Sequence, residues 1–155
     1  MDTRTKKNSL TFDMSGESND MKLDQKLIDA AMDFLNKRFP GKEGGIAAMY
    51  TEDGEILLSS SPDTLNESTT LCHEVGALCE AYKKDKRIAA TVCVARFPDD
   101  GPVIILAPCG ICQERLMIYG DAVECAVAAE HDPTQWEART LKELQPYHWR
   151  HAIHG

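Results

Sequence analysis

Two short cysteine-bearing stretches constrain this chain more than any other feature of its sequence. The first covers residues 72–74 and reads Cys-His-Glu, and the second covers residues 108–112 and reads Pro-Cys-Gly-Ile-Cys. Three thiolates can hold a zinc ion and leave its fourth position open, as catalytic zinc sites do. A strand-rich interval separates the two stretches, so the fold must bring them together. We therefore expect a Zn²⁺ site formed by Cys72, Cys109 and Cys112.

Glu74 follows Cys72 by two residues, so it lies close to the expected metal without being needed as a ligand. A carboxylate in this place can take a proton from a water molecule at the metal and pass it to a leaving nitrogen. His73 is expected to face away, because neighbouring residues of a helix point about 100° apart. The His-Glu pair is also not a metalloprotease motif, because that motif needs a second His where this chain has Ala77.

Both cysteine stretches are expected at the N-termini of helices, where unpaired N–H groups favour negative charge and lower thiol pKa values. This matters because three thiolates carry more negative charge than one zinc ion balances. Arg115 follows Cys112 by three residues and is a further group that could offset the surplus.

Composition narrows the class of protein. The chain has 155 residues, the length of one domain, and a formal net charge of −8. The negative charge argues against a nucleic-acid partner, because such binding depends on Lys and Arg neutralising phosphates. No apolar run is long enough for a membrane span and no secretory signal is evident, so we expect a cytoplasmic protein with reduced cysteines. Cys79, Cys93 and Cys125 are expected to be small buried hydrophobic residues.

Residues 1–20 are polar and are expected to form a flexible leader, whereas residues 21–155 are expected to form a single domain. Apolar spacing and turn residues predict helices over 21–39, 71–83, 109–119 and 140–144, strands over 44–50, 56–58, 88–97, 103–106 and 122–128, and a polar loop over 132–139. The strands are nearly continuous in apolar residues, which indicates a sheet covered on both faces. We therefore expect an α/β fold, a three-layer α/β/α domain with a five-stranded mixed sheet.

The pattern Cys-x-Glu followed by Pro-Cys-Gly-x-Cys resembles the zinc signature of the cytidine deaminase superfamily. The segment from Leu141 to Trp149 resembles the ending of small homotetrameric cytidine deaminases, and the resemblance spans about Lys22 to Trp149. It implies that the three cysteines bind zinc, that Glu74 is the proton shuttle and that the N–H of Cys72 lies near the attacked ring.

The resemblance also implies a hydrolytic reaction, in which water attacks the amidine carbon of a cytosine-like ring and ammonia leaves. The expected substrate is a cytosine nucleoside, cytidine or deoxycytidine, as in pyrimidine salvage, with no nucleic acid or membrane partner. Trp149 would replace the aromatic residue that reaches a neighbouring active site in the tetrameric enzymes, so a homo-oligomer, a tetramer or a dimer, is expected.

The chain departs from the family in two places. The tetrameric enzymes usually carry Arg after the catalytic Glu and Arg-Gln after the last cysteine, where this chain has Val75 and Gln113-Glu114. The nucleoside enzymes also carry Asn-x-Glu upstream, to hold the ribose. Without a gap, Ser61 and Asp63 fall at those positions, and Asn66 and Glu67 could serve if the loop shifts.

Asp63, Asn66, Glu67 and Trp149 are therefore the candidate substrate-binding residues. Three functions remain open: a cytidine deaminase, a deaminase of a modified cytosine nucleoside such as blasticidin S, and a catalytically silent zinc-binding protein of the same fold. The silent protein would fill all four zinc positions with side chains.

Overall fold

The computed structural model describes residues 21–154, so the leader expected over residues 1–20 lies outside the described part of the chain. The elements follow one another as α1 (Gln25–Arg38), β1 (Gly44–Thr51), β2 (Ile56–Ser59), η1 (Glu67–Thr69), α2 (Val75–Lys83), β3 (Ile88–Arg96), β4 (Val103–Leu106), α3 (Gly110–Leu116), η2 (Met117–Tyr119), β5 (Glu124–Ala129), β6 (Asp132–Thr140), α4 (Leu141–Leu144) and α5 (Trp149–His154).

The strands form one mixed sheet, in the order β2-β1-β3-β5-β6, with β4 also paired to β3. Strand β3 pairs in parallel with β5, whereas its pairings with β1 and β4 are antiparallel. Two partners share one edge of β3: β5 pairs with Ala90 and Thr91, and β4 pairs with Cys93 through Arg96. All nine residues of β3 are buried, as expected for the central strand of a covered sheet.

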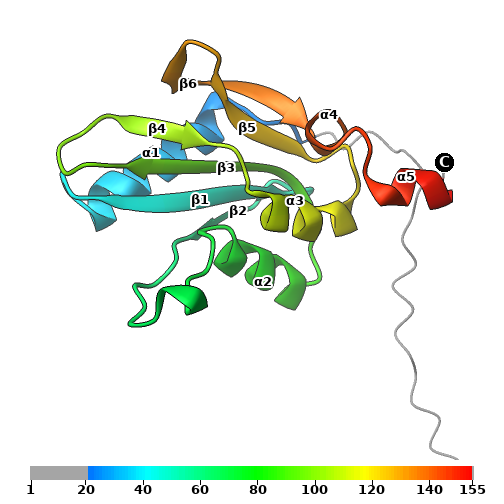
Figure 1. Cartoon of the computed structure of the whole chain (residues 1–155), viewed down its shortest axis with the longest axis horizontal. Helices are drawn as coiled ribbons and strands as arrows, with labels where there is room; N and C mark the ends of the chain where they lie inside the picture. The colour runs from blue at the N-terminus through cyan, green and yellow to red at the C-terminus, as the bar shows by residue number, and fades with distance from the viewer. Residues whose placement is uncertain (1–20, 155) are drawn as a thin grey trace, which may run out of the picture.

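Helices cover both faces of the sheet, which confirms the three-layer α/β/α architecture (Figure 1). Helix α1 lies on one face and packs its buried residues against β1 and β3. Its N-terminus is capped by Asp24, whose carboxylate accepts a hydrogen bond from the N–H of Leu27. Helices α2 and α3 lie on the opposite face, over a second core cluster that includes Leu78, Leu116 and Cys125 (Figure 1). Both cysteine-bearing stretches are therefore on this second face.

The strands predicted over residues 44–50 and 56–58 are present and form a hairpin. Strands β1 and β2 pair antiparallel, with Tyr50 opposite Ile56. Gly54 has a φ of +85°, a left-handed conformation that glycine adopts without steric cost. This hairpin delivers the chain from β2 into residues 60–70, the loop that leads to Cys72.

The sheet has six strands, so the prediction of five was wrong. The segment predicted as a polar loop, residues 132–139, lies instead within β6, which runs antiparallel to β5. Its first four residues are exposed, and it ends the sheet beyond β5. Edge strands carry polar residues and tolerate Pro, here Pro133, so this strand has the composition of a loop.

Two helix predictions also change. Helix α2 begins at Val75 instead of residue 71, because the 3₁₀ turn η1 and a short turn precede it, and Glu74 takes the N-cap position. Its buried residues are Ala77, Leu78 and Ala81, whereas Cys79, predicted to be buried, is exposed. Helix α5 was not predicted. Among the described residues, no helix has the length and apolarity that crossing a membrane requires.

Candidate functional site

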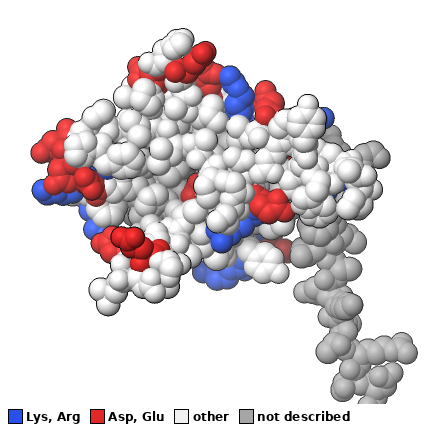
Figure 2. All heavy atoms as spheres, in the orientation of Figure 1, with Lys and Arg blue, Asp and Glu red and all other residues white. Residues whose placement is uncertain are grey.

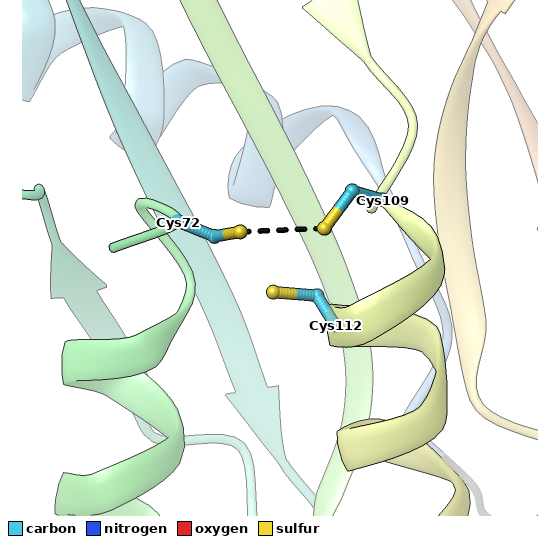
Figure 3. Close-up of side chains that lie close together, drawn as sticks. All are labelled: Cys72, Cys109 and Cys112. Carbon is cyan, nitrogen blue, oxygen red and sulfur yellow. Dashed lines mark hydrogen bonds between the residues drawn. The ribbon is translucent and has the colours of Figure 1, made fainter. Parts of the chain in front are cut away.

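The three cysteines come from the starts of two helices on the same face of the sheet. Cys109 is the N-cap of α3, where its carbonyl accepts a hydrogen bond of 2.8 Å from the N–H of Gln113. Cys112 lies in the first turn of α3 and is buried. Cys72 precedes α2, in a turn that the N–H of Val75 closes on the Cys72 carbonyl at 3.2 Å. The turn and the helix start thus present their side chains to each other (Figure 3).

The three sulfur atoms form one cluster. They lie within 4.8 Å of one another, and the Sγ atoms of Cys72 and Cys109 are 3.3 Å apart (Figure 3). Zn–S bonds of about 2.3 Å in a tetrahedron place sulfur atoms roughly 3.8 Å apart. The spacing therefore fits a single zinc ion, and the thiolate donor set is one that zinc prefers. Among residues 21–154, no fourth His, Cys, Asp or Glu joins this cluster.

Glu74 is buried beside the cluster, with 5% of its surface exposed. Its charge raises the pKa of Cys112, after the larger effect of burial, and contributes in the same way at Cys125, whose pKa rises to about 12. The backbone carbonyl of Glu74 accepts a hydrogen bond from Leu78, so the first turn of α2 fixes its position.

The thiols differ in their electrostatic surroundings. Burial raises the pKa of Cys109, but hydrogen bonds from the N–H groups of Cys112 and Ile111 and from the Cys72 and Cys112 thiols together outweigh this effect, so its pKa lies below the ordinary value. Burial raises the pKa of Cys72 and of Cys112. Arg115 lies close to the second of these, with Nη1 3.9 Å from the Cys112 sulfur. Arg115 therefore places a positive charge beside the sulfur cluster, although the family's usual arginine positions hold other residues.

His73 points away from the cluster, as predicted. Its ring lies against Gly45 at the start of β1, and its Nδ1 accepts a hydrogen bond of 3.1 Å from the N–H of Ser61. Burial lowers the pKa of the imidazole. The sequence alone gave no sign of these contacts, because Gly45 and Ser61 are far from His73 along the chain.

The candidate sugar-binding residues lie in the loop before the turn that contains Cys72 and Glu74. Asp63, Asn66 and Glu67 are all exposed. The Asn66 side chain caps η1, since its Oδ1 accepts hydrogen bonds from the N–H and the hydroxyl of Ser68. The loop thus has free carboxylates at Asp63 and Glu67, whereas the amide oxygen of Asn66 is engaged within the loop itself.

The C-terminal segment packs on α3 through two contacts that the sequence did not reveal. The amide of Gln145 donates to Oε1 of Gln113 at 2.8 Å, and Nε2 of His148 lies 2.7 Å from the Glu114 carboxylate. Gln113 and Glu114 occupy the positions where the family usually carries Arg-Gln. Trp149 stands next to buried His148 and remains 60% exposed.

The charged side chains are distributed unevenly on the face that carries α2 and α3 (Figure 2). Its centre is largely uncharged, acidic groups gather at its rim, and the basic groups are scattered. With a net charge of −8, this surface lacks the continuous basic patch that binds nucleic acid.

Solved structures that resemble this one include cytidine deaminases. The crystal structure of the cytidine deaminase from Bacillus anthracis matches with a TM-score of 0.77 and 42% sequence identity, over 84% of this chain and 91% of that chain. The enzyme from Mycobacterium leprae matches with a TM-score of 0.60 and 21% identity, over 79% of this chain and 96% of that chain. The second match shows the fold alone.

Two curated relatives are also similar in sequence, whereas no family model matches the chain. Blasticidin-S deaminase of Bacillus cereus is 25% identical over 128 residues, which cover 79% of this chain and 89% of that protein. Cytidine deaminase of Mycobacterium tuberculosis strain H37Rv is 29% identical over 75 residues, which cover 48% of this chain and 53% of that protein. With 42% identity to the Bacillus anthracis enzyme over nearly its whole length, the chain belongs to the cytidine deaminase superfamily.

Proposed function

We propose that this protein is a zinc-dependent hydrolase that deaminates a cytosine nucleoside, converting cytidine or deoxycytidine into uridine or deoxyuridine and ammonia. One observation carries the proposal. Three sulfur atoms converge within 4.8 Å, and the carboxylate of Glu74 is buried beside them without belonging to the cluster. This arrangement matches the division of labour in zinc deaminases, where a Glu that is not a ligand handles protons.

In this proposal Cys72, Cys109 and Cys112 hold the ion. Zinc supplies Lewis acidity, which lowers the pKa of a coordinated water to about 7. The Glu74 carboxylate takes one proton from the attacking water and gives it to the ring nitrogen. It then takes the second proton of that water and gives it to the leaving amine, which departs as ammonia. Burial keeps bulk water away from this carboxylate, and the first turn of α2 keeps it in place. Arg115 offsets part of the thiolate charge.

A modified cytosine nucleoside such as blasticidin S is the second candidate substrate. The blasticidin-S deaminase of Bacillus cereus is similar over most of both chains. The loop over residues 60–70 also lacks the Asn-x-Glu arrangement of the nucleoside enzymes in its ungapped position. Because this loop presents Asp63 and Glu67 to solvent, it can bind sugar hydroxyls or a cationic substituent.

The catalytically silent alternative requires a fourth protein ligand. His73 was the residue that could have provided it, but its Nδ1 accepts a hydrogen bond from Ser61 and its ring lies against Gly45. This geometry supports an open position on the metal and therefore an enzyme.

The exposed apolar residues support a homo-oligomer. Tyr147, Trp149 and Ile153 in the C-terminal segment and Ile111 on α3 are each at least 60% exposed. Aromatic side chains are enriched at protein interfaces. We propose that this surface joins copies of the chain into a dimer or tetramer. Sedimentation of the purified protein would measure the mass of the assembly. A site of free thiolates also needs a reducing compartment, which supports a cytoplasmic role in nucleoside salvage.

The test compares the parent protein with the Glu74→Gln and Glu80→Gln variants. The parent should release ammonia from cytidine, with loss of the cytosine absorbance. Glu74→Gln should keep its zinc and lose activity by about 10²–10⁴-fold, because the proton carrier is gone. Glu80→Gln, on the same helix, should remain active. Turnover of blasticidin S without turnover of cytidine would favour the second substrate, and full activity in Glu74→Gln would refute the mechanism.

A further inference from the structure

The ring of His73 fills a space that exists only because residue 45 is glycine. A Cβ atom at Gly45 would lie 2.2 Å from Nε2 of His73, far inside van der Waals contact. The His73 ring is half-buried against the backbone at the start of β1. Gly45 has an ordinary strand conformation and pairs with Ala95 of β3, so its lack of a side chain serves this contact.

The other ring nitrogen binds the start of the loop over residues 60–70. Nδ1 of His73 accepts a hydrogen bond of 3.1 Å from the backbone N–H of Ser61, and the hydroxyl of Ser61 lies 3.2 Å from the same nitrogen. A backbone N–H can only donate, so Nδ1 carries no proton and the imidazole is neutral.

Two further hydrogen bonds hold the end of β2 in place. The hydroxyl of Ser59 donates to the His73 carbonyl, and the hydroxyl of Ser60 donates to the Gly45 carbonyl of β1 at 2.7 Å. The Ser59 bond and the imidazole thus tie the end of β2 to the turn that contains Cys72 and Glu74, and the Ser60 bond ties it to β1. The loop therefore leaves Ser61 and returns to Cys72 with its two ends fixed to each other, in the manner of a closed Ω-loop.

We infer that His73 is a positioning residue that ties the neck of the 60–70 loop to the turn containing Cys72 and Glu74 and so sets the position of the loop carboxylates relative to the reacting centre. The inference rests on the proposed function for its substrate. The carboxylates of Asp63 and Glu67 belong to this loop, whereas Cys72 and Glu74 flank His73 in the chain. A loop fixed at its neck before substrate arrives does not have to be ordered on binding, which favours affinity.

The test uses His73→Leu, which keeps a branched apolar bulk but has no acceptor, and His73→Asn, whose Oδ1 replaces Nδ1. His131→Leu is the control, because His131 is exposed in the turn before β6. His73→Leu should keep its zinc and its kcat within about twofold and raise the KM for cytidine about fivefold to tenfold, the effect of one hydrogen bond. His73→Asn should restore most of this loss, and His131→Leu should match the parent.

Hydrogen exchange at the Ser61 amide gives a second readout that does not depend on activity. Exchange should be about fivefold to tenfold faster in His73→Leu than in the parent, because its acceptor is gone, and near the parental rate in His73→Asn. An unchanged KM in His73→Leu, equal defects in both His73 variants, or unchanged Ser61 exchange would each overturn the inference. A parent without cytidine turnover would refute the proposed substrate instead, and the exchange measurement would still decide the role of His73.

Discussion

The two sides of the site are built in different ways. The sulfur side consists of helix starts on a buried sheet, and Cys112 and Glu74 have almost no exposed surface. The proposed sugar side is the loop over residues 60–70, in which every residue from 65 to 70 is exposed and Leu65 reaches fully into solvent. Under the proposed function, the packed side would determine the chemistry, and the exposed side would be free to determine which nucleoside is accepted.

The largest expected effect is on the sulfur side. Cys109→Ser should leave the protein with little zinc and with activity at background, because serine is a poor ligand where a thiolate is required. Cys79→Ser is the matched control, since Cys79 is also exposed but lies on the outer surface of α2. Zinc content by elemental analysis and turnover of cytidine check both variants. A Cys109→Ser protein with full zinc would show that the metal is held elsewhere.

Arg115 should come next in size. Removing its charge in Arg115→Met leaves the thiolates less balanced, and loss of such an outer partner typically weakens metal affinity by about 10–100-fold. Lys37→Met is the control. It removes an equal charge from an exposed position of α1, on the opposite face of the sheet, and should not change zinc affinity. Competition with a chromophoric chelator measures both. Equal affinities in the two variants would assign charge balance to the helix N-terminus alone.

On the sugar side the expected effects are smaller and confined to KM. Asp63→Ala should raise the KM for cytidine about fivefold, through loss of hydrogen bonds to the sugar, while zinc content and kcat stay at parental levels. Glu130→Ala removes an equally exposed carboxylate at the tip of the β5–β6 hairpin and serves as the control. A fall in kcat or in zinc content for Asp63→Ala would break the separation between the two sides.

The smallest effect is expected where the C-terminal segment braces α3. The hydrogen bond from His148 holds the pKa of Glu114 below its ordinary value. The resulting stabilisation is present above the ordinary pKa of a glutamate, about 4.3, and is lost as the pH falls through the lowered pKa. Thermal unfolding of the parent should thus show a slight acid-dependent loss that Glu114→Gln lacks. Identical pH profiles would remove this contact from the account of α3.

Much of the fold was accessible from the sequence because its signals are local. Apolar periodicity predicted α1, turn residues separated the strands β1 and β2, and unbroken apolar runs predicted a sheet covered on both faces. Strand β6 was missed because an edge strand exposes much of its surface, so its residues have the composition of a loop. Cys79 was misplaced because the buried face of α2 follows Ala77, Leu78 and Ala81, which leaves Cys79 on its exposed side.

The candidate site also has a part that local sequence signals predict and a part that they do not. The cysteines and Glu74 could be grouped from their spacing, because short-range geometry and metal chemistry limit what such residues can do. The contacts of His73 with Gly45 and Ser61, and of Glu114 with His148, join residues that are distant in the chain. Nothing in a single sequence marks such pairs, since each residue alone has an ordinary reason to be present.

The divided edge of β3 has a consequence for how members of this family can diversify. Between Thr91 and Cys93 the pairing passes from β5 to β4, and the chain leaves β4 for Cys109 beside this junction. The sulfur cluster lies over β3 (Figure 3), and the charges of Glu74, Cys72 and Cys109 add to the pKa rise that burial causes at Cys93. Because the sheet supports the sulfur cluster, the loop over residues 60–70 can be lengthened, shortened or replaced to accommodate a new ligand while the reacting centre keeps its place.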